Sequence, residues 1–114
     1  VVEDSEYARK SLRSIFESAD IDVVEVEDPL EAIEVYKKEN PDIVTLDITM
    51  PEKDGTEVLK EILDVDPYAK VIMITSNGQD SSISKTILMG ASHYVSKPFN
   101  PSKVLRVIEK VQNS

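Results

Sequence analysis

Five polar residues directly follow short apolar runs, and their side chains suit phosphoryl transfer. They are Glu3, Asp4, Asp47, Thr75 and Lys97. Three carboxylates brought together repel one another, so we expect either raised carboxyl pKa values or a bound cation. Oxygen ligands without a metal-binding His or Cys favour a hard ion such as Mg²⁺ (or Mn²⁺), and Mg²⁺ prefers phosphate partners. A carboxylate beside such an ion can attack phosphorus and form an aspartyl phosphate, while the hydroxyl and the ammonium stabilise the transferring charge.

These side chains meet only if the apolar runs form one sheet. The runs cover residues 1–2, 23–26, 43–46, 71–74 and 93–96, and segments with helical spacing of apolar residues separate them. This alternation predicts right-handed crossovers and a parallel sheet covered by helices on both faces. We therefore expect an α/β fold with a doubly wound, five-stranded sheet in the flavodoxin-like order 2-1-3-4-5. In such a sheet ligands bind outside the carboxyl ends of the strands, where the five polar residues lie.

The helical segments have recognisable boundaries. We expect the first helix to have an N-cap at Asp4 or Ser5 and an inward-facing stripe that extends to Ala19. Asp28 followed by Pro29 predicts the start of a second helix, because Asp is a good N-cap and Pro suits the first helical position. Further boundaries are predicted at Asn40–Pro41, Gly90 and Pro101.

The chain is predicted to be one domain over residues 1–114. Its length fits a single modest core, and it contains no repeat and no Gly/Ser-rich linker. The first apolar run has only Val1 and Val2 before Glu3, whereas a strand usually has about 5–6 residues. We therefore expect a first strand that is trimmed at its N-terminus.

Charge and composition exclude several classes of protein. The formal net charge of −9 opposes direct binding to nucleic acid, whose phosphates repel an acidic surface. No apolar run approaches the roughly 18 residues that a membrane span needs, so no membrane partner is expected. Because the chain has no cysteine, it has neither a disulfide framework nor a thiolate metal site, which is compatible with a reducing cytoplasm.

Four ordered motifs carry a resemblance to a known family. They are VVEDS at 1–5, DIVTLDITMPEKDG at 42–55, VIMITS at 71–76 and YVSKPF at 94–99. Together they resemble the response-regulator receiver domains of two-component signalling, over essentially the whole chain. The string DITMP is also similar to the chemotaxis-type members of that family, which favours a single-domain regulator.

The resemblance implies roles for the acidic residues. Asp47 would be the phosphorylated residue and would also ligate the metal ion. Asp4 would bind the metal directly, Glu3 would act through a water molecule, and the backbone carbonyl of Thr49 would be the third protein ligand. Many members of the family have Asp-Asp where this chain has Glu-Asp, a variation that leaves the metal site plausible.

The resemblance also implies a switch. Thr75 would contact the phosphoryl group and move toward it, Lys97 would pair with that group, and Tyr94 would swing inward as the aromatic switch residue. The bond between Lys97 and Pro98 is expected to be cis. Ser76 stands where a small apolar residue is more usual.

The expected function is a phosphorylation-dependent signalling switch. A histidine kinase or a phosphotransfer protein would donate the phosphoryl group, and the reshaped surface of the fourth helix, fifth strand and fifth helix would reach a downstream protein or an output domain. The chain would catalyse only its own phosphorylation and slow dephosphorylation.

Three alternatives share this architecture. An aspartyl-phosphate phosphatase commonly needs an acid two residues after the nucleophile, where this chain has Thr49. A receiver-like module that is never phosphorylated would tend to lack one of the acids, and all are present. A flavodoxin-type nucleotide carrier would need a phosphate-binding Gly-rich loop after the first strand, which the sequence lacks.

Overall fold

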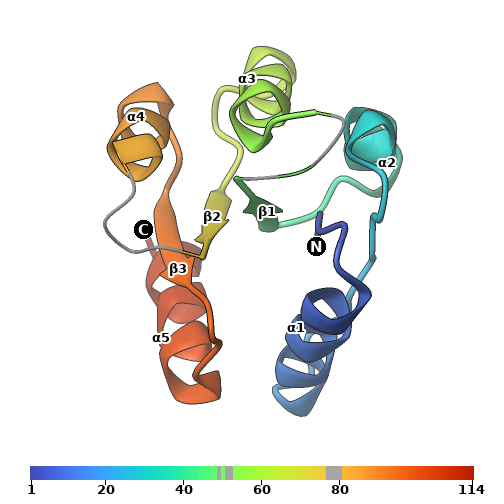
Figure 1. The fold of residues 1–114 in the computed structure, drawn as a ribbon, viewed down its shortest axis with the longest axis vertical. Helices are drawn as coiled ribbons and strands as arrows, with labels where there is room; N and C mark the ends of the chain where they lie inside the picture. Colours follow the sequence, from blue (N-terminus) through green and yellow to red (C-terminus); the bar gives the residue numbers. More distant parts are fainter. Residues whose placement is uncertain (49, 51–52, 77–80) are drawn as a thin grey trace.

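The computed structural model describes residues 1–48, 50, 53–76 and 81–114 of the chain. Three parallel strands form the central sheet of this part in the order β1-β2-β3, namely β1 (Val44–Asp47), β2 (Val71–Thr75) and β3 (His93–Ser96). Every residue of β1 and β2 is buried, as the nearly continuous apolar runs predict for strands covered on both faces. Figure 1 shows helices on both sides of this sheet.

The first two predicted strands are each reduced to one bridging residue, so the described residues form three regular strands where the sequence predicts five. Val2 forms parallel bridges with Val26 on one side and Leu46 on the other. Its amide donates to the carbonyl of Thr45 at 2.8 Å, and the amide of Glu3 donates to the carbonyl of Val26 at 3.0 Å. With only two residues before Glu3, there is too little chain for a regular ladder, but the bridges keep the order 2-1-3-4-5.

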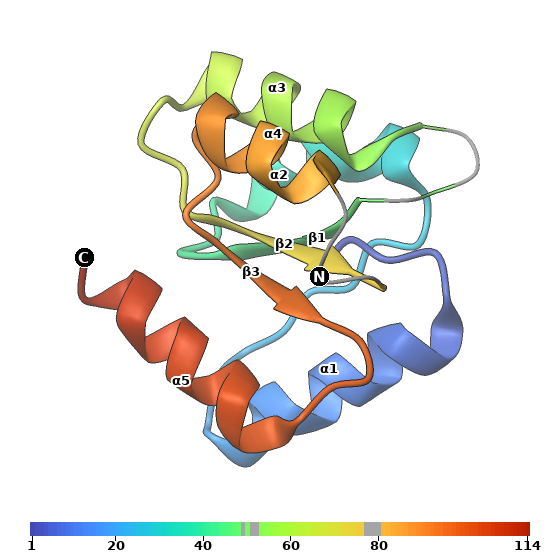
Figure 2. The same cartoon turned by 60° about the vertical axis from the view of Figure 1, so that its left-hand side comes forward.

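Two helical layers cover the sheet. One layer contains the short 3₁₀ helix η1 (Pro29–Glu31) with α2 (Ala32–Glu39), α3 (Gly55–Val65) and α4 (Ser81–Met89); the other contains α1 (Glu6–Ser18) and α5 (Pro101–Gln112). Figures 1 and 2 show α2, α3 and α4 on one face and α1 and α5 on the other. Each layer encloses its own apolar core against the sheet. No helix in the described ranges is long and apolar enough to cross a membrane.

The helix boundaries mostly follow the predicted capping residues. Ser5, and not Asp4, caps α1 by accepting from the amide of Ala8. The predicted stripe of α1 is wrong at its end, because Ala19 lies beyond the last turn and is exposed. Asp28 accepts from the amide of Leu30 as predicted, but it begins η1, and α2 follows. The expected ends of α2 and α4 are confirmed at Asn40, with φ of 47°, and at Gly90, with φ of 120°.

Gly55 lies where the start of α3 touches the end of β1. Its amide donates to the carbonyl of Ile48 at 2.8 Å. A Cβ atom at this position would lie 2.1 Å from the carbonyl oxygen of Asp47 and 2.7 Å from the Cα atom of Ile48. Since these are backbone atoms of a buried strand end, no rotamer change relieves the overlap. A residue without a side chain therefore lets α3 approach the strand that carries Asp47.

We predict that Gly55→Ala destabilises the fold by about 3 kcal/mol, the upper end of the usual cost of overpacking a core. The added methyl group must push α3 and the end of β1 apart. Urea unfolding at neutral pH measures the change. Glu57→Ala is the matched control, because it adds no volume at an exposed position in the same helical turn. Equal stability of the two variants would contradict the contact between Gly55 and β1.

Candidate functional site

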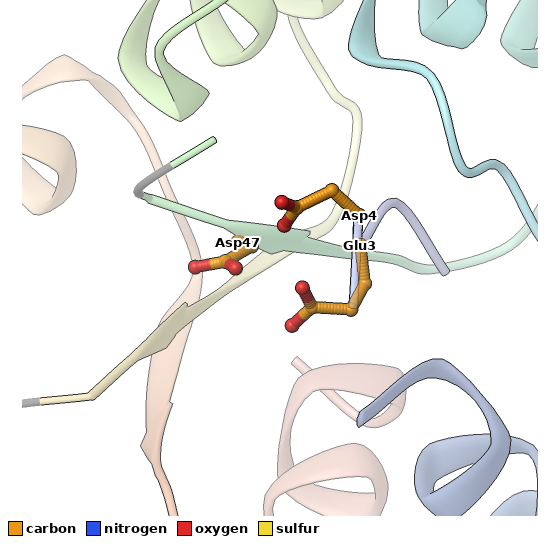
Figure 3. A group of neighbouring side chains, drawn as sticks. All are labelled: Glu3, Asp4 and Asp47. Carbon is orange, nitrogen blue, oxygen red and sulfur yellow. The ribbon is translucent and has the colours of Figure 1, made fainter. Parts of the chain in front are cut away.

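The acidic residues meet at the carboxyl end of β1. Asp47 is the last residue of this strand, and its amide donates to the carbonyl of Val2 at 3.1 Å. That hydrogen bond and the Val2–Leu46 bridge bring the following residues, Glu3 and Asp4, beside Asp47. Figure 3 shows the side chains of Glu3 and Asp4 directed toward the strand end where Asp47 lies.

The three carboxylates form one compact group. One oxygen from each of Glu3, Asp4 and Asp47 lies within 4.8 Å of the others. Glu3 is fully buried at 0% exposure and Asp47 is buried at 5%, whereas Asp4 is partly exposed. The Oε2 atom of Glu3 accepts a hydrogen bond from the amide of Ser5 at 3.1 Å. Glu3 is thus the inner member of the group, and Asp4 lies nearest to solvent.

Lys97 directly follows β3 and reaches this group across the end of β2. Its amide donates to the carbonyl of Thr75 at 2.7 Å, and its bond to Pro98 is cis, as expected. The Nζ atom lies 2.8 Å from Oε1 of Glu3 and 3.4 Å from Oδ2 of Asp47. Burial lowers the pKa of Lys97, but the contact with Glu3 and the negative charges of Asp47 and Glu3 outweigh it and raise the pKa above its ordinary value.

Burial and the neighbouring Glu3 both change the acidity of Asp4 in the direction that the sequence predicts for clustered carboxylates. Burial raises the pKa of Asp4 above its ordinary value, and the hydrogen bond and negative charge of Glu3 raise it further. A backbone hydrogen bond and the positive charge of Lys97 act in the opposite direction. The fold therefore holds a carboxylate at some cost near neutral pH, and a cation bound beside it would reduce that cost.

The donor set fits a small divalent cation. Mg²⁺ binds oxygen at about 2.0–2.1 Å, so two oxygens on opposite sides of the ion are about 4.2 Å apart. The three carboxylate oxygens lie within 4.8 Å of one another, so two of them can bind one ion after modest side-chain movements. When all are ionised, three negative charges and the one positive charge of Lys97 leave a net charge of −2, which a divalent cation balances.

The structure brings together Glu3, Asp4, Asp47 and Lys97. The other predicted site residues are Thr75, Tyr94 and Thr49. Thr75 is the last residue of β2 and is 2% exposed, one position beyond Ile74, the partner of Asp47 in the strand register. Tyr94 lies on β3 with 38% of its surface exposed, so it faces outward in this conformation. Thr49 lies outside the described residues.

Arg9 and Glu25 were not singled out by sequence reasoning, yet they support the acidic turn. The Nη1 atom of Arg9 donates to the backbone carbonyls of Glu3 at 3.1 Å and Asp4 at 3.3 Å, while its Nε atom donates to Glu25 at 3.1 Å. A signal was present in the sequence, because Arg9 is spaced three residues before Leu12 on the apolar face of α1. An arginine on the buried face of a helix needs hydrogen-bond acceptors inside the protein, so its position predicts such contacts.

Comparison with known proteins gives a consistent result. Residues 1–109 match the family model described as the response regulator receiver domain. The chemotaxis protein CheY of Listeria monocytogenes is 44% identical over 96% of this chain and 93% of its own length. The chemotaxis protein CheY of Thermotoga maritima is 41% identical over 97% of this chain and 93% of its own length.

Solved structures agree in fold. The CheX–CheY–BeF₃–Mg²⁺ complex of Borrelia burgdorferi contains a chain that matches with a TM-score of 0.90 and 38% identity, over 96% of this chain and 84% of that one. The response regulator domain of Thermotoga maritima CheB matches with a TM-score of 0.89 and 31% identity, over 99% of this chain and 93% of that one.

The pKa of Asp4 provides a test of the crowded group. We predict that Glu3→Gln lowers this pKa toward 3.8, because the substitution removes a neighbouring negative charge. Lys97→Met should raise it, because a positive charge is lost. Since the folded pKa of Asp4 lies above its ordinary value, protonation adds stability as the pH falls through the folded pKa, and that stability is absent at neutral pH.

Carbon-13 NMR of the side-chain carboxyl groups in metal-free buffer measures the titration of Asp4. Glu6→Gln serves as the control, because it removes one negative charge at an exposed position in the first turn of α1. An identical shift in the Glu3 and Glu6 variants would contradict a specific interaction between Glu3 and Asp4.

Proposed function

The chain belongs to the response regulator receiver family, whose CheY-type members are switches phosphorylated on an aspartate, and we propose that Asp47 is the phosphorylated residue here. The observation that carries this proposal is the position of Asp47. It is buried at the end of a central strand, in a group with the carboxylates of Glu3 and Asp4, and its Oδ2 atom lies 3.4 Å from the ammonium of Lys97.

The proposed reaction transfers a phosphoryl group from a phosphohistidine to Asp47. A carboxylate oxygen of Asp47 attacks phosphorus, the P–N bond breaks, and its electron pair stays on the imidazole nitrogen. Glu3 is a poorer candidate for the nucleophile, because Lys97 lies 2.8 Å from one of its oxygens and the amide of Ser5 binds the other. Lys97 would pair with the phosphoryl oxygens, and the hydroxyl of Thr75 would donate to one of them.

We infer that the cation of this site is Mg²⁺ (or Mn²⁺). The all-oxygen donor set and the net charge of the group support a hard divalent ion, and the similar Borrelia burgdorferi CheY is described in complex with Mg²⁺ and BeF₃. Asp4 and Asp47 would bind the ion directly and Glu3 through water, with the carbonyl of Thr49 as a further ligand. The bound ion would neutralise charge on the transferring phosphoryl group.

The proposed output is a change at the surface formed by α4, β3 and α5. Phosphorylation would draw Thr75 toward Asp47, and Tyr94 would move into the space that this movement opens. Tyr94 is 38% exposed before this movement, and Ile87 and Leu88 on α4 are also exposed. Such an apolar surface suits a protein partner.

The remaining parts of the proposal concern the partners and the reset of the switch. The phosphodonor would be a histidine kinase or a phosphotransfer protein, and the target would be another protein or an output domain. We propose that the chain catalyses only its own phosphorylation and slow dephosphorylation, since Thr49 stands where a phosphatase commonly has its second acid. A single domain over residues 1–114 and a cytoplasmic location stay predictions.

Asp47→Asn should abolish phosphorylation by acetyl phosphate and Mg²⁺, because an amide oxygen is a poor nucleophile toward phosphorus. Mass spectrometry after brief incubation measures the added phosphoryl group, and its stability to pH identifies an acyl phosphate. Removal of Mg²⁺ with a chelator should abolish the product in the unmodified chain as well.

Asp42→Asn is the matched control, because Asp42 is an exposed aspartate near the other end of the same strand. It should be phosphorylated at the normal rate. Normal labelling of the Asp47 variant would assign the phosphorylated residue elsewhere, and catalytic release of phosphate from external esters would favour a phosphatase.

A single tryptophan reporter tests the switch, because the chain contains no tryptophan. Tyr94→Trp should show a blue-shifted emission on phosphorylation as the indole leaves water. Adding Thr75→Ala should remove this shift while leaving phosphorylation of Asp47 detectable. Tyr68→Trp, at a residue that is 90% exposed, is the control and should show no shift. An emission shift that persists in the Thr75→Ala variant would contradict the proposed coupling between Thr75 and Tyr94.

A further inference from the structure

Arg9 is a buried cation that contacts the backbone of the acidic turn. The residue lies in the first half of α1 and is 7% exposed. Its Nη1 atom is within hydrogen-bonding distance of two consecutive carbonyl oxygens, those of Glu3 and Asp4. These two residues supply two of the three clustered carboxylates, so one guanidinium group holds the backbone that carries most of the group's negative charge.

The direction of each carboxylate depends on that backbone. The turn after Val2 has left the sheet, and the regular hydrogen bonds of α1 have not yet begun, so its carbonyls need other donors. Repulsion among the three carboxylates also favours any movement that separates them. A donor that bridges the carbonyls of Glu3 and Asp4 opposes this movement.

Glu25 in turn orients Arg9. The Oε1 atom of Glu25 lies 3.1 Å from Nε of Arg9, and the side chains are 11% and 9% exposed, respectively. Hydrogen bonds from Arg13 and Lys10 lower the pKa of Glu25 to about 2. Burial acts in the opposite direction, and the hydrogen bond from Arg9 lowers the pKa further. Glu25 therefore remains charged near neutral pH. Arg13 and Lys10 contact it with side chains that are 39% and 57% exposed.

We propose that Arg9 is a positioning residue for the divalent cation, which holds the backbone of Glu3 and Asp4 so that their carboxylates stay directed toward Asp47. This inference rests on the proposed metal site, but not on the identity of the phosphorylated residue. Groups that orient metal ligands commonly change metal affinity by about 10–100-fold when they are removed. Arg9 acts on the ligands through their backbone, and Glu25 acts one contact further away.

The test compares metal affinity in variants of the α1 cluster. Isothermal titration calorimetry with Mg²⁺, and electron paramagnetic resonance with Mn²⁺, measure the dissociation constants in the absence of phosphodonor. Arg9→Met should weaken binding by about tenfold, the lower end of the range for groups that orient ligands. Arg9→Lys should weaken it less, because one ammonium keeps the charge but cannot reproduce the fixed fork of the guanidinium. Glu25→Gln should have a smaller effect in the same direction.

Arg13→Met is the matched control. It removes a cation of the same type that contacts Glu25 from the same helix, and Arg13 makes its hydrogen bonds to Glu25 and Glu17. Its metal affinity should stay within about twofold of the unmodified chain, well below the change expected when a group that orients ligands is lost. Thermal unfolding of each variant shows whether it is folded at the temperature of the titration.

A positioning role also makes a kinetic prediction. In folded Arg9 variants the Mg²⁺ concentration at half-maximal phosphorylation should rise, while the maximal rate at saturating Mg²⁺ stays near that of the unmodified chain. A merely structural role would lower the unfolding temperature without changing either the metal affinity or this concentration. If Arg9→Met does not fold, Arg9→Lys and Glu25→Gln decide the question.

Two results would overturn the inference: unchanged metal affinity in folded Arg9 variants, or an equal loss in Arg13→Met. Absence of metal binding by the unmodified chain would overturn it together with the proposed metal site. If Asp47→Asn is still phosphorylated while Arg9→Met loses metal affinity, the assignment of Asp47 fails and the role of Arg9 stands.

Discussion

Electrostatic repulsion among three carboxylates is the constraint on which the rest of the site depends. Glu3, Asp4 and Asp47 place oxygens within 4.8 Å of one another at a buried strand end, where water screens them poorly. Lys97 offsets part of this charge, and burial together with the neighbouring Glu3 raises the pKa of Asp4 above its ordinary value. The remaining negative charge favours binding of a divalent cation. The positive charges of that cation and of Lys97 would in turn favour a phosphoryl group.

The scaffold holds these charges together by contacts that lie beneath and beside them. Gly55 lets α3 approach the backbone of Asp47, so the strand end is packed against a helix. On the other side, Arg9 binds the carbonyls of Glu3 and Asp4, which have left the sheet and have not entered α1. Neither contact touches a phosphoryl group, yet both resist the separation of the carboxylates that repulsion favours. In the proposed metal site, the position of the carboxylates therefore depends on contacts made by α3 and α1.

The predictable part of the fold follows from strong local signals. Apolar runs ending at Asp47 and Thr75 became fully buried strands, and Asn40 and Gly90 adopted the backbone conformations that end helices. The number of regular strands was overestimated, since the first two predicted strands are reduced to the bridges of Val2 with Val26 and Leu46. Burial of Ala19 failed as well. These errors lie at the ends of helices and strands, where the hydrophobic pattern carries least information. There, tertiary contacts decide whether a strand continues its pairing or a helix adds another turn.

Sequence alone singled out the residues proposed to carry the chemistry and determined that they gather at one edge, because parallel strands joined by helices must present their carboxyl ends on the same side. It also determined the family resemblance, since the motifs stand in order over the whole chain. Only the tertiary structure decided the arrangement within the group: Lys97 nearer to Glu3 than to Asp47, and Arg9 beneath the acidic turn. The physical reason is that distances between charged side chains, and the buried donors that hold them, depend on long-range packing that no local pattern encodes.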